Sequence, residues 1–124
     1  MKNTNDRKRM TGVFRKYSRL GLASRSLDAF DAYDRIRGCC RSKKEARELL
    51  AVYDTVRFLR LTDNTDALRA LYDIYFLSAG RPLRKSEISR RITRHAYDNN
   101  CDERTVYRRL SYAFAIYRKM LGED

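Results

Sequence analysis

The sequence predicts an all-α fold, a small helical bundle of about five helices, and three observations support it. Apolar residues recur at steps of three and four, and strict apolar–polar alternation is almost absent. Several segments open with residues that cap helices. Short clusters of Gly, Pro, Asn and Asp separate these segments. With 124 residues, 43% of them hydrophobic, the chain suits one core and is too short for a second.

Residues 1–25 form the first segment, which carries eight basic side chains, one acid, Gly12 and Gly21. We expect a flexible basic arm, because polar, charged termini seldom pack. A short amphipathic helix is the alternative within this arm. Four apolar residues have the spacing that such a helix needs: Val13, Phe14, Tyr17 and Leu20. A single helical domain then follows over residues 26–124.

Two helices are predicted in the first half of this domain. The first spans about 26–36 and is ended by Gly38. The second spans about 42–62 and opens with the letters S-K-K-E, which are typical of a capping box with Ser42 as the cap and Glu45 at the third helical position. Both helices have an apolar face that requires a packing partner.

Three further helices are predicted in the second half. The helix over about 66–78 is apolar on nearly every side, so we expect it to be the central, buried element. A helix over about 86–97 follows, then a turn at 98–100. The last helix is capped by Asp102 and runs to about Leu121. The segment from about 84 to 121 therefore predicts a helix-turn-helix.

The formal charge of +12 and the pI of about 10.0 indicate a polyanionic partner. The distribution of this charge is more informative than its sum. Residues 26–80 hold nine basic and nine acidic side chains, and residues 81–119 hold eleven basic and four acidic ones. A neutral middle therefore lies between two basic blocks, and the second basic block coincides with the predicted helix-turn-helix.

The last helix presents polar and basic residues early, as insertion into a DNA major groove requires. Arg forks pair with guanine edges and Thr contacts bases or a thymine methyl group. The predicted base-reading residues are Glu103, Arg104, Thr105 and Arg108. Basic residues on the preceding helix and next to the reading positions are expected to hold phosphates, which sets register rather than sequence preference. The predicted phosphate-binding residues are Arg84, Lys85, Arg90, Arg91, Arg94 and Arg109.

The strings L-R-K-S-E-I-S-R-R-I and C-D-E-R-T-V-Y-R-R-L resemble the helix-turn-helix of sigma factor region four. The likeness is closer to small phage transcriptional activators of the ArpU and RinA type, and A-L-R-A-L-Y-D-I-Y-F is similar to the helix before their reading head. The resemblance covers about residues 67–121. It implies a sigma-like ending to the bundle, a phage or mobile-element regulator of transcription, and Asp102 as cap of the recognition helix.

Double-stranded DNA is the predicted partner, and RNA polymerase is a further candidate. The alternative is an RNA-binding or protein-interaction module, anti-CRISPR-like or polymerase-binding, that uses the same basic surface. A homodimer is also expected, because dimers read two half-sites and Phe30, Tyr33 and Val56 lack evident partners. Stacking of bases on tyrosines is another reading. Five tyrosines are instead expected in the core: Tyr53, Tyr72, Tyr75, Tyr107 and Tyr117; Tyr97 and Tyr112 are left open.

Catalysis and cofactors are not expected, because no phosphate-cradling glycine loop and no nucleophile motif is present. Asp28, Asp31 and Asp34 share a helical face that would suit a divalent cation, but neighbouring arginines favour a solvated face. The cysteines have no disulfide or zinc spacing, and we expect His95 to be solvated. Lacking a membrane-length apolar run, the chain is expected to be cytoplasmic.

Overall fold

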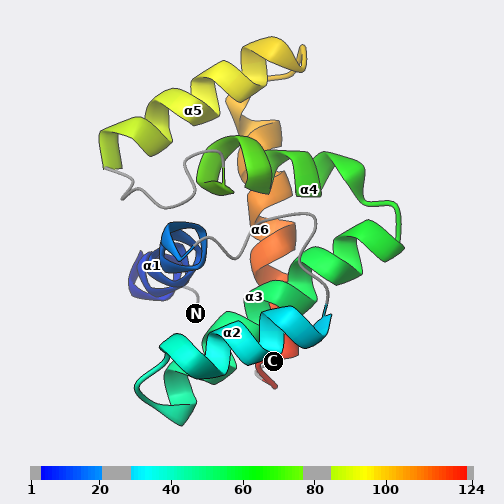
Figure 1. Ribbon diagram of the computed structural model, residues 1–124. Helices are drawn as coiled ribbons and strands as arrows, with labels where there is room; N and C mark the ends of the chain where they lie inside the picture. Colours follow the sequence, from blue (N-terminus) through cyan, green and yellow to red (C-terminus); the bar gives the residue numbers. More distant parts are fainter. Residues whose placement is uncertain (1–3, 21–28, 77–84, 123–124) are drawn as a thin grey trace.

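The computed structural model describes residues 4–20, 29–76 and 85–122, and all regular structure in these ranges is helical (Figure 1). The predicted all-α fold is therefore confirmed for this part of the chain. The elements in order are α1 (Thr4–Arg19), α2 (Ala29–Cys39), α3 (Lys43–Leu61), α4 (Thr65–Leu71), a π-helical turn η1 (Tyr72–Phe76), α5 (Lys85–Asp98) and α6 (Glu103–Met120).

The capping signals place the starts of α3 and α6 correctly, whereas the helix predicted over about 26–36 is α2, described from Ala29 to Cys39. Glu45 donates its backbone N–H to Ser42 Oγ at 3.1 Å, and the Glu45 carboxylate accepts the backbone N–H of Arg41 at 3.1 Å. The predicted capping box is thus present, with its return bond one residue earlier than the usual position. The predicted helix over 66–78 is α4 continued by the wider π turn of η1.

The amino-terminal segment differs from the expected flexible arm, because Thr4–Arg19 forms α1 and packs into the core. Phe14 is fully buried, with its ring centroid 5.2 Å from that of Phe114 and 5.3 Å from that of Tyr117. Met10 and Tyr17 are buried one turn to either side of Phe14. Burial of this apolar stripe outweighs the high charge of the segment, since the charged residues need only lie on the other face.

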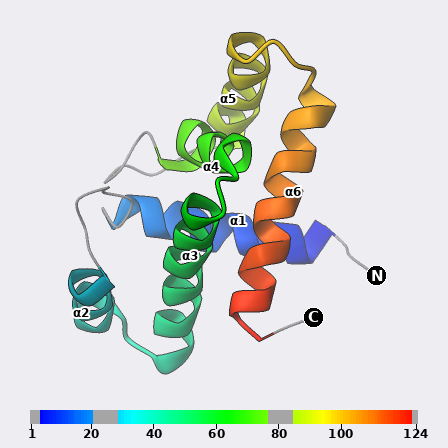
Figure 2. The same cartoon turned by 90° about the vertical axis from the view of Figure 1, so that its right-hand side faces the viewer.

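The hydrophobic core contains residues of every described helix, and α6 contributes buried residues along most of its length. Figure 2 shows α6 along one side of the molecule, from α5 toward the opposite end, with α1 crossing it. It packs against α3, α4 and α5. The inward side of α6 is apolar and buried, with Val106, Leu110, Ala113, Phe114 and Tyr117. Both predicted elements, the buried α4–η1 segment and the amphipathic last helix, therefore contribute to the core.

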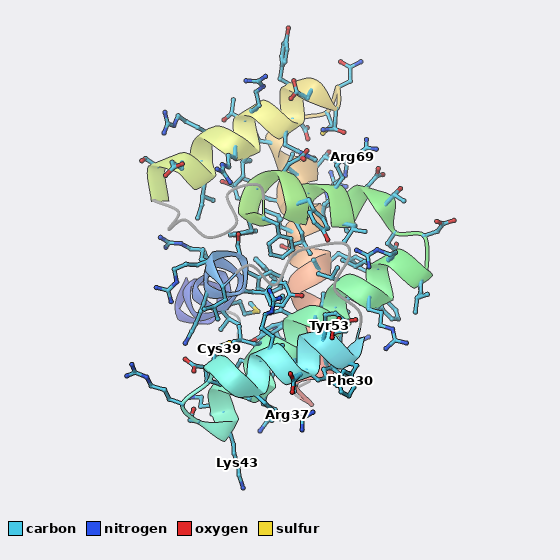
Figure 3. All side chains as sticks on the ribbon, viewed as in Figure 1. Phe30, Arg37, Cys39, Lys43, Tyr53 and Arg69 are labelled. Atoms are coloured by element: carbon cyan, nitrogen blue, oxygen red, sulfur yellow. The ribbon has the colours of Figure 1, made fainter. Side chains whose placement is uncertain are left out.

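Several side chains lie elsewhere than expected. His95 is 1% exposed rather than solvated, and Tyr107 is 41% exposed rather than in the core. Val56 is buried, and Tyr33 packs edge-on against the ring of Tyr53, so both have partners within the chain. Phe30 on α2 remains 76% exposed (Figure 3). Among the described helices, none combines the length and the apolar character that a membrane span needs.

Candidate nucleic-acid interface

The connection between α5 and α6 is a tight turn with a defined backbone. Asn100 adopts a left-handed conformation with φ of 58°. The backbone N–H of Cys101 donates to Ala96 O at 3.0 Å, and that of Asn100 donates to Tyr97 O at 3.3 Å. These two bonds form a Schellman ending of α5, in which Asn replaces the usual Gly because its short polar side chain tolerates this backbone region. The turn therefore fixes where α6 begins.

Asp102 caps α6, as the sequence predicts. Its Oδ1 accepts both the backbone N–H and the hydroxyl of Thr105, each at 2.8 Å. These bonds from Thr105, with smaller contributions from the positive charges of Arg104 and Arg108, lower the pKa of the Asp102 carboxyl below its ordinary value of 3.8. A negative charge at this end also matches the positive pole of the helix dipole.

The lowered pKa of Asp102 predicts a loss of stability in acid. A depressed pKa in the folded state means that the contribution is complete above 3.8 and disappears as the pH falls through the folded value. In Asp102→Asn, an amide still caps the helix but does not titrate. We expect the melting temperatures of the wild type and the variant to converge below pH 3.8. Thermal unfolding between pH 2 and 6 measures this difference, and parallel curves for the two proteins would contradict it.

A second contact ties α5 to the start of α6. Thr93 on α5 donates its hydroxyl to Glu103 Oε2 at 2.8 Å. Two of the four predicted base-reading residues, Glu103 and Thr105, are thus engaged within the protein. Their hydrogen bonds position the first turn of α6. The Glu103 contact was not evident from the sequence, because its partner Thr93 lies on another helix.

The other two predicted base-reading residues, Arg104 and Arg108, are exposed on one face of α6. Neither makes a hydrogen bond or an ion pair with any part of the chain that the structure describes. Ser111 and Ala115 continue the same exposed face at helical spacing. We call these four residues the reading face. It carries two arginine forks at the capped end of the helix and small side chains further along.

The predicted phosphate-binding residues divide into two groups. Arg90 and Arg94 are exposed on α5, and Arg94 forms a solvent-exposed ion pair with Asp98 at 3.3 Å. Arg91 instead points inward and donates to Ile74 O at 3.1 Å. Lys85 is the first residue of α5, and Arg84 lies outside the described residues.

Arg109 belongs with the inward group. It is partly buried, and its guanidinium lies 3.7 Å from an Asp66 carboxylate oxygen and 3.8 Å from Cys101 Sγ. Arg91 and Arg109 therefore join elements of the protein, and among the described members of this set Arg90 and Arg94 are the arginines that face solvent. The two groups differ in whether the arginine side chain faces the core or the solvent. The amino-acid sequence alone does not reveal that difference.

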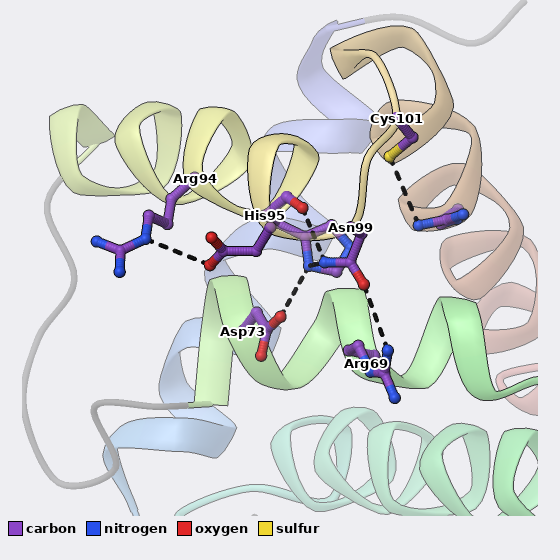
Figure 4. Close-up of polar contacts among 8 residues, drawn as sticks. Arg69, Asp73, Arg94, His95, Asn99 and Cys101 are labelled. Atoms are coloured by element: carbon purple, nitrogen blue, oxygen red, sulfur yellow. Dashed lines mark hydrogen bonds and ion pairs between the residues drawn. The ribbon is translucent and has the colours of Figure 1, made fainter.

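His95 is the centre of a polar network that the sequence did not indicate (Figure 4). Its Nδ1 lies 2.8 Å from Asp73 Oδ2 of η1, and Asn99 Nδ2 donates to His95 O at 2.8 Å. Arg69 of α4 donates to Asn99 Oδ1 at 3.3 Å. The network joins α4 and η1 to the end of α5, so it fixes the base on which the turn and α6 stand. The four-residue step from His95 to Asn99 was visible, but Asp73 is too distant in sequence to have been paired with them.

The described ranges contain no group of three His, Cys, Asp or Glu side chains that could hold a metal ion. Of the three aspartates considered, Asp31 and Asp34 lie on α2, and Asp28 lies outside the described residues. Cys39, Cys40 and Cys101 are free thiols. The exposed side chains of α5 and α6 beside the turn instead form a basic, hydrogen-bonding surface.

This surface consists of the reading face of α6 and the arginines on the outside of α5, held by a capped turn. In comparisons with family models, curated proteins and solved structures, the chain matches none. The resemblance to sigma factor region four and to the ArpU and RinA activators therefore stays a prediction.

Proposed function

We propose that this protein is a sequence-specific, double-stranded DNA-binding regulator of transcription, in which α6 enters the major groove. The observation that carries the proposal is the reading face, where Arg104 and Arg108 are exposed on one side of a capped helix. Guanidinium groups that are not paired with any described residue are available for bidentate hydrogen bonds to the O6 and N7 atoms of guanine.

The packing behind α6 supports this role. A recognition helix discriminates between bases only if its side chains are held at a constant position relative to the backbone contacts. Here the inward side of α6 is buried against α3 and α4, and the Thr93–Glu103 bond joins its first turn to α5. Arg90 and Arg94 on α5 then contact phosphates and set the register.

Duplex DNA fits this surface better than duplex RNA does. The major groove of B-form DNA admits an α-helix, whereas that of A-form RNA is too deep and narrow for side chains to read. A single exposed helical face with two arginines matches the first geometry. RNA polymerase is proposed as a further partner, on the sigma-like resemblance alone. A second copy of the chain is proposed on the exposed Phe30 of α2.

Selection from a random duplex pool tests the proposal. We expect the full chain at 100 mM salt to enrich a recurring short motif, and an unlabelled duplex with that motif to compete better than structured RNA of equal length. Enrichment without a motif would overturn sequence specificity. Stronger competition by the RNA would favour the RNA-binding alternative.

A further inference from the structure

The outer side of α5 carries a shallow hollow next to the reading face. Its lining residues are Ser89, Arg90, Thr93, Arg94 and Tyr97. Tyr97 is 83% exposed, which is unusual for a large aromatic side chain in a protein whose other tyrosines are mostly buried or half-buried. Because Thr93 is bonded to Glu103, this α5 hollow adjoins the first turn of α6. The Tyr97 ring with its hydroxyl, the Ser89 hydroxyl and two arginines thus lie together on an exposed side of α5.

The opposite flank of α6 has no excess of positive charge. A cleft between the α3–α4 connection and α6 is lined by Asp63 and Asp66 on one side and by Arg108, Arg109 and Tyr112 on the other, so two guanidinium groups balance its two carboxylates. Asp66 is largely exposed and pairs with Arg109, so this arginine is already engaged within the protein. The carboxylates of this charge-balanced cleft offset its arginines, whereas no lining carboxylate offsets the two cations of the α5 hollow, which attract phosphates. The two flanks of the reading face are therefore not equivalent toward a polyanion.

We propose that the α5 hollow, rather than the charge-balanced cleft on the other flank, binds one sugar–phosphate strand of the duplex, with Tyr97 as an uncharged anchor. The proposal rests on the proposed function. It adds the direction in which the protein docks on the duplex and one further contact residue, Tyr97. The charges favour this occupant, because Arg90 has no ion-pair partner among the described residues. The Arg94–Asp98 pair is largely exposed, so a phosphate displaces it at little cost.

Tyr97 suits a nucleic-acid backbone for two reasons. Its ring gives the hollow an apolar wall that packs against deoxyribose, and its hydroxyl donates to a phosphate oxygen. Tyr97 is neutral, so its contact releases no counterion and does not contribute to the salt dependence of binding. Each arginine–phosphate contact, in contrast, contributes about 0.9 to the slope of log affinity against log salt.

The experiment compares affinity and salt slope for the wild type, Tyr97→Phe, Tyr97→Ala and Arg90→Ala on one selected duplex. We expect Tyr97→Phe to weaken binding about 3- to 10-fold and Tyr97→Ala to weaken it further, both with an unchanged salt slope. Arg90→Ala should weaken binding and reduce the slope by about 1. Tyr112→Ala is the matched control, because Tyr112 is a partly exposed tyrosine that lines the charge-balanced cleft, and the affinity of this variant should stay within 2-fold of the wild type.

The outcomes separate this inference from the proposed function. If the wild type binds the duplex and both Tyr97 variants bind equally well, the α5 hollow is not the docking site. A larger loss in Tyr112→Ala than in Tyr97→Ala would place the strand on the opposite flank and overturn the proposal. If the wild type binds no duplex at low salt, the proposed function itself is wrong. Tyr97 is exposed, so circular dichroism is expected to show the same fold in all variants.

Discussion

Replacing Arg104 or Arg108 by alanine is expected to relax the base preference of this protein, each at a cost of about 1–3 kcal/mol on the selected duplex. Both guanidinium groups are exposed and lie one turn apart on α6. Each substitution is therefore expected to remove one base contact while the helix stays in place. The cost is specific to the preferred sequence, because a bidentate arginine–guanine pair is lost only where that guanine is present. Binding to duplexes without the motif should change far less.

The measurement is a repeat of the duplex selection with each variant. Arg37→Ala is the control, because Arg37 is an exposed arginine on α2 and its removal changes the net charge by the same amount (Figure 3). We expect one motif position to lose its base preference in Arg104→Ala, a different position in Arg108→Ala, and none in Arg37→Ala. If both α6 variants select the wild-type motif, α6 is not the recognition helix.

Phe14→Ala is expected to lower the free energy of unfolding by about 3–5 kcal/mol, the largest effect on stability that we predict. The Phe14 ring is fully buried and contacts four other rings, those of Tyr75, Phe76, Phe114 and Tyr117. Alanine at this position leaves a cavity between α1, η1 and α6, and the surrounding aromatic rings can fill it only in part.

Phe30→Ala is the matched control, because it removes the same side chain from a position that is 76% exposed. Urea unfolding of the two variants measures the difference. We expect Phe30→Ala to stay within about 0.5 kcal/mol of the wild type. Equal unfolding midpoints for the two variants would mean that α1 does not pack on the core in solution, and residues 1–25 would then behave as the flexible arm that their charge suggests.

The helices α3 and α6 were predictable because their signals are local. Ser42 and Asp102 each bond to a backbone N–H three residues further along, so the sequence contains both partners of each contact. The buried apolar residues of α6 recur at the helical period, so they too can be recognised in the sequence. The prediction of a capped helix after a turn is confirmed, because Asp102 caps α6.

The distinction between inward and outward arginines was not predictable. Arg90 and Arg91 are neighbours in sequence, yet Arg90 is exposed and Arg91 donates to Ile74 O on η1. One step along a helix turns a side chain by about 100°, and the face that meets the core depends on how α5 docks on η1. The burial of His95 beside Asp73 has the same origin, because a contact across 22 residues exists only in the folded chain.

The sequence by itself determined the helical class, the caps and the concentration of positive charge at the two ends of the chain, since each depends on residues close together in the chain. Only the tertiary structure decided that α1 packs into the core and that Glu103 bonds to Thr93 of α5. It also decided that Arg104, Arg108, Arg90 and Arg94 are the arginines presented to solvent beside the turn. The physical reason is that burial and pairing are set by the docking of helices, and charge alone does not show which side of a helix the core will cover.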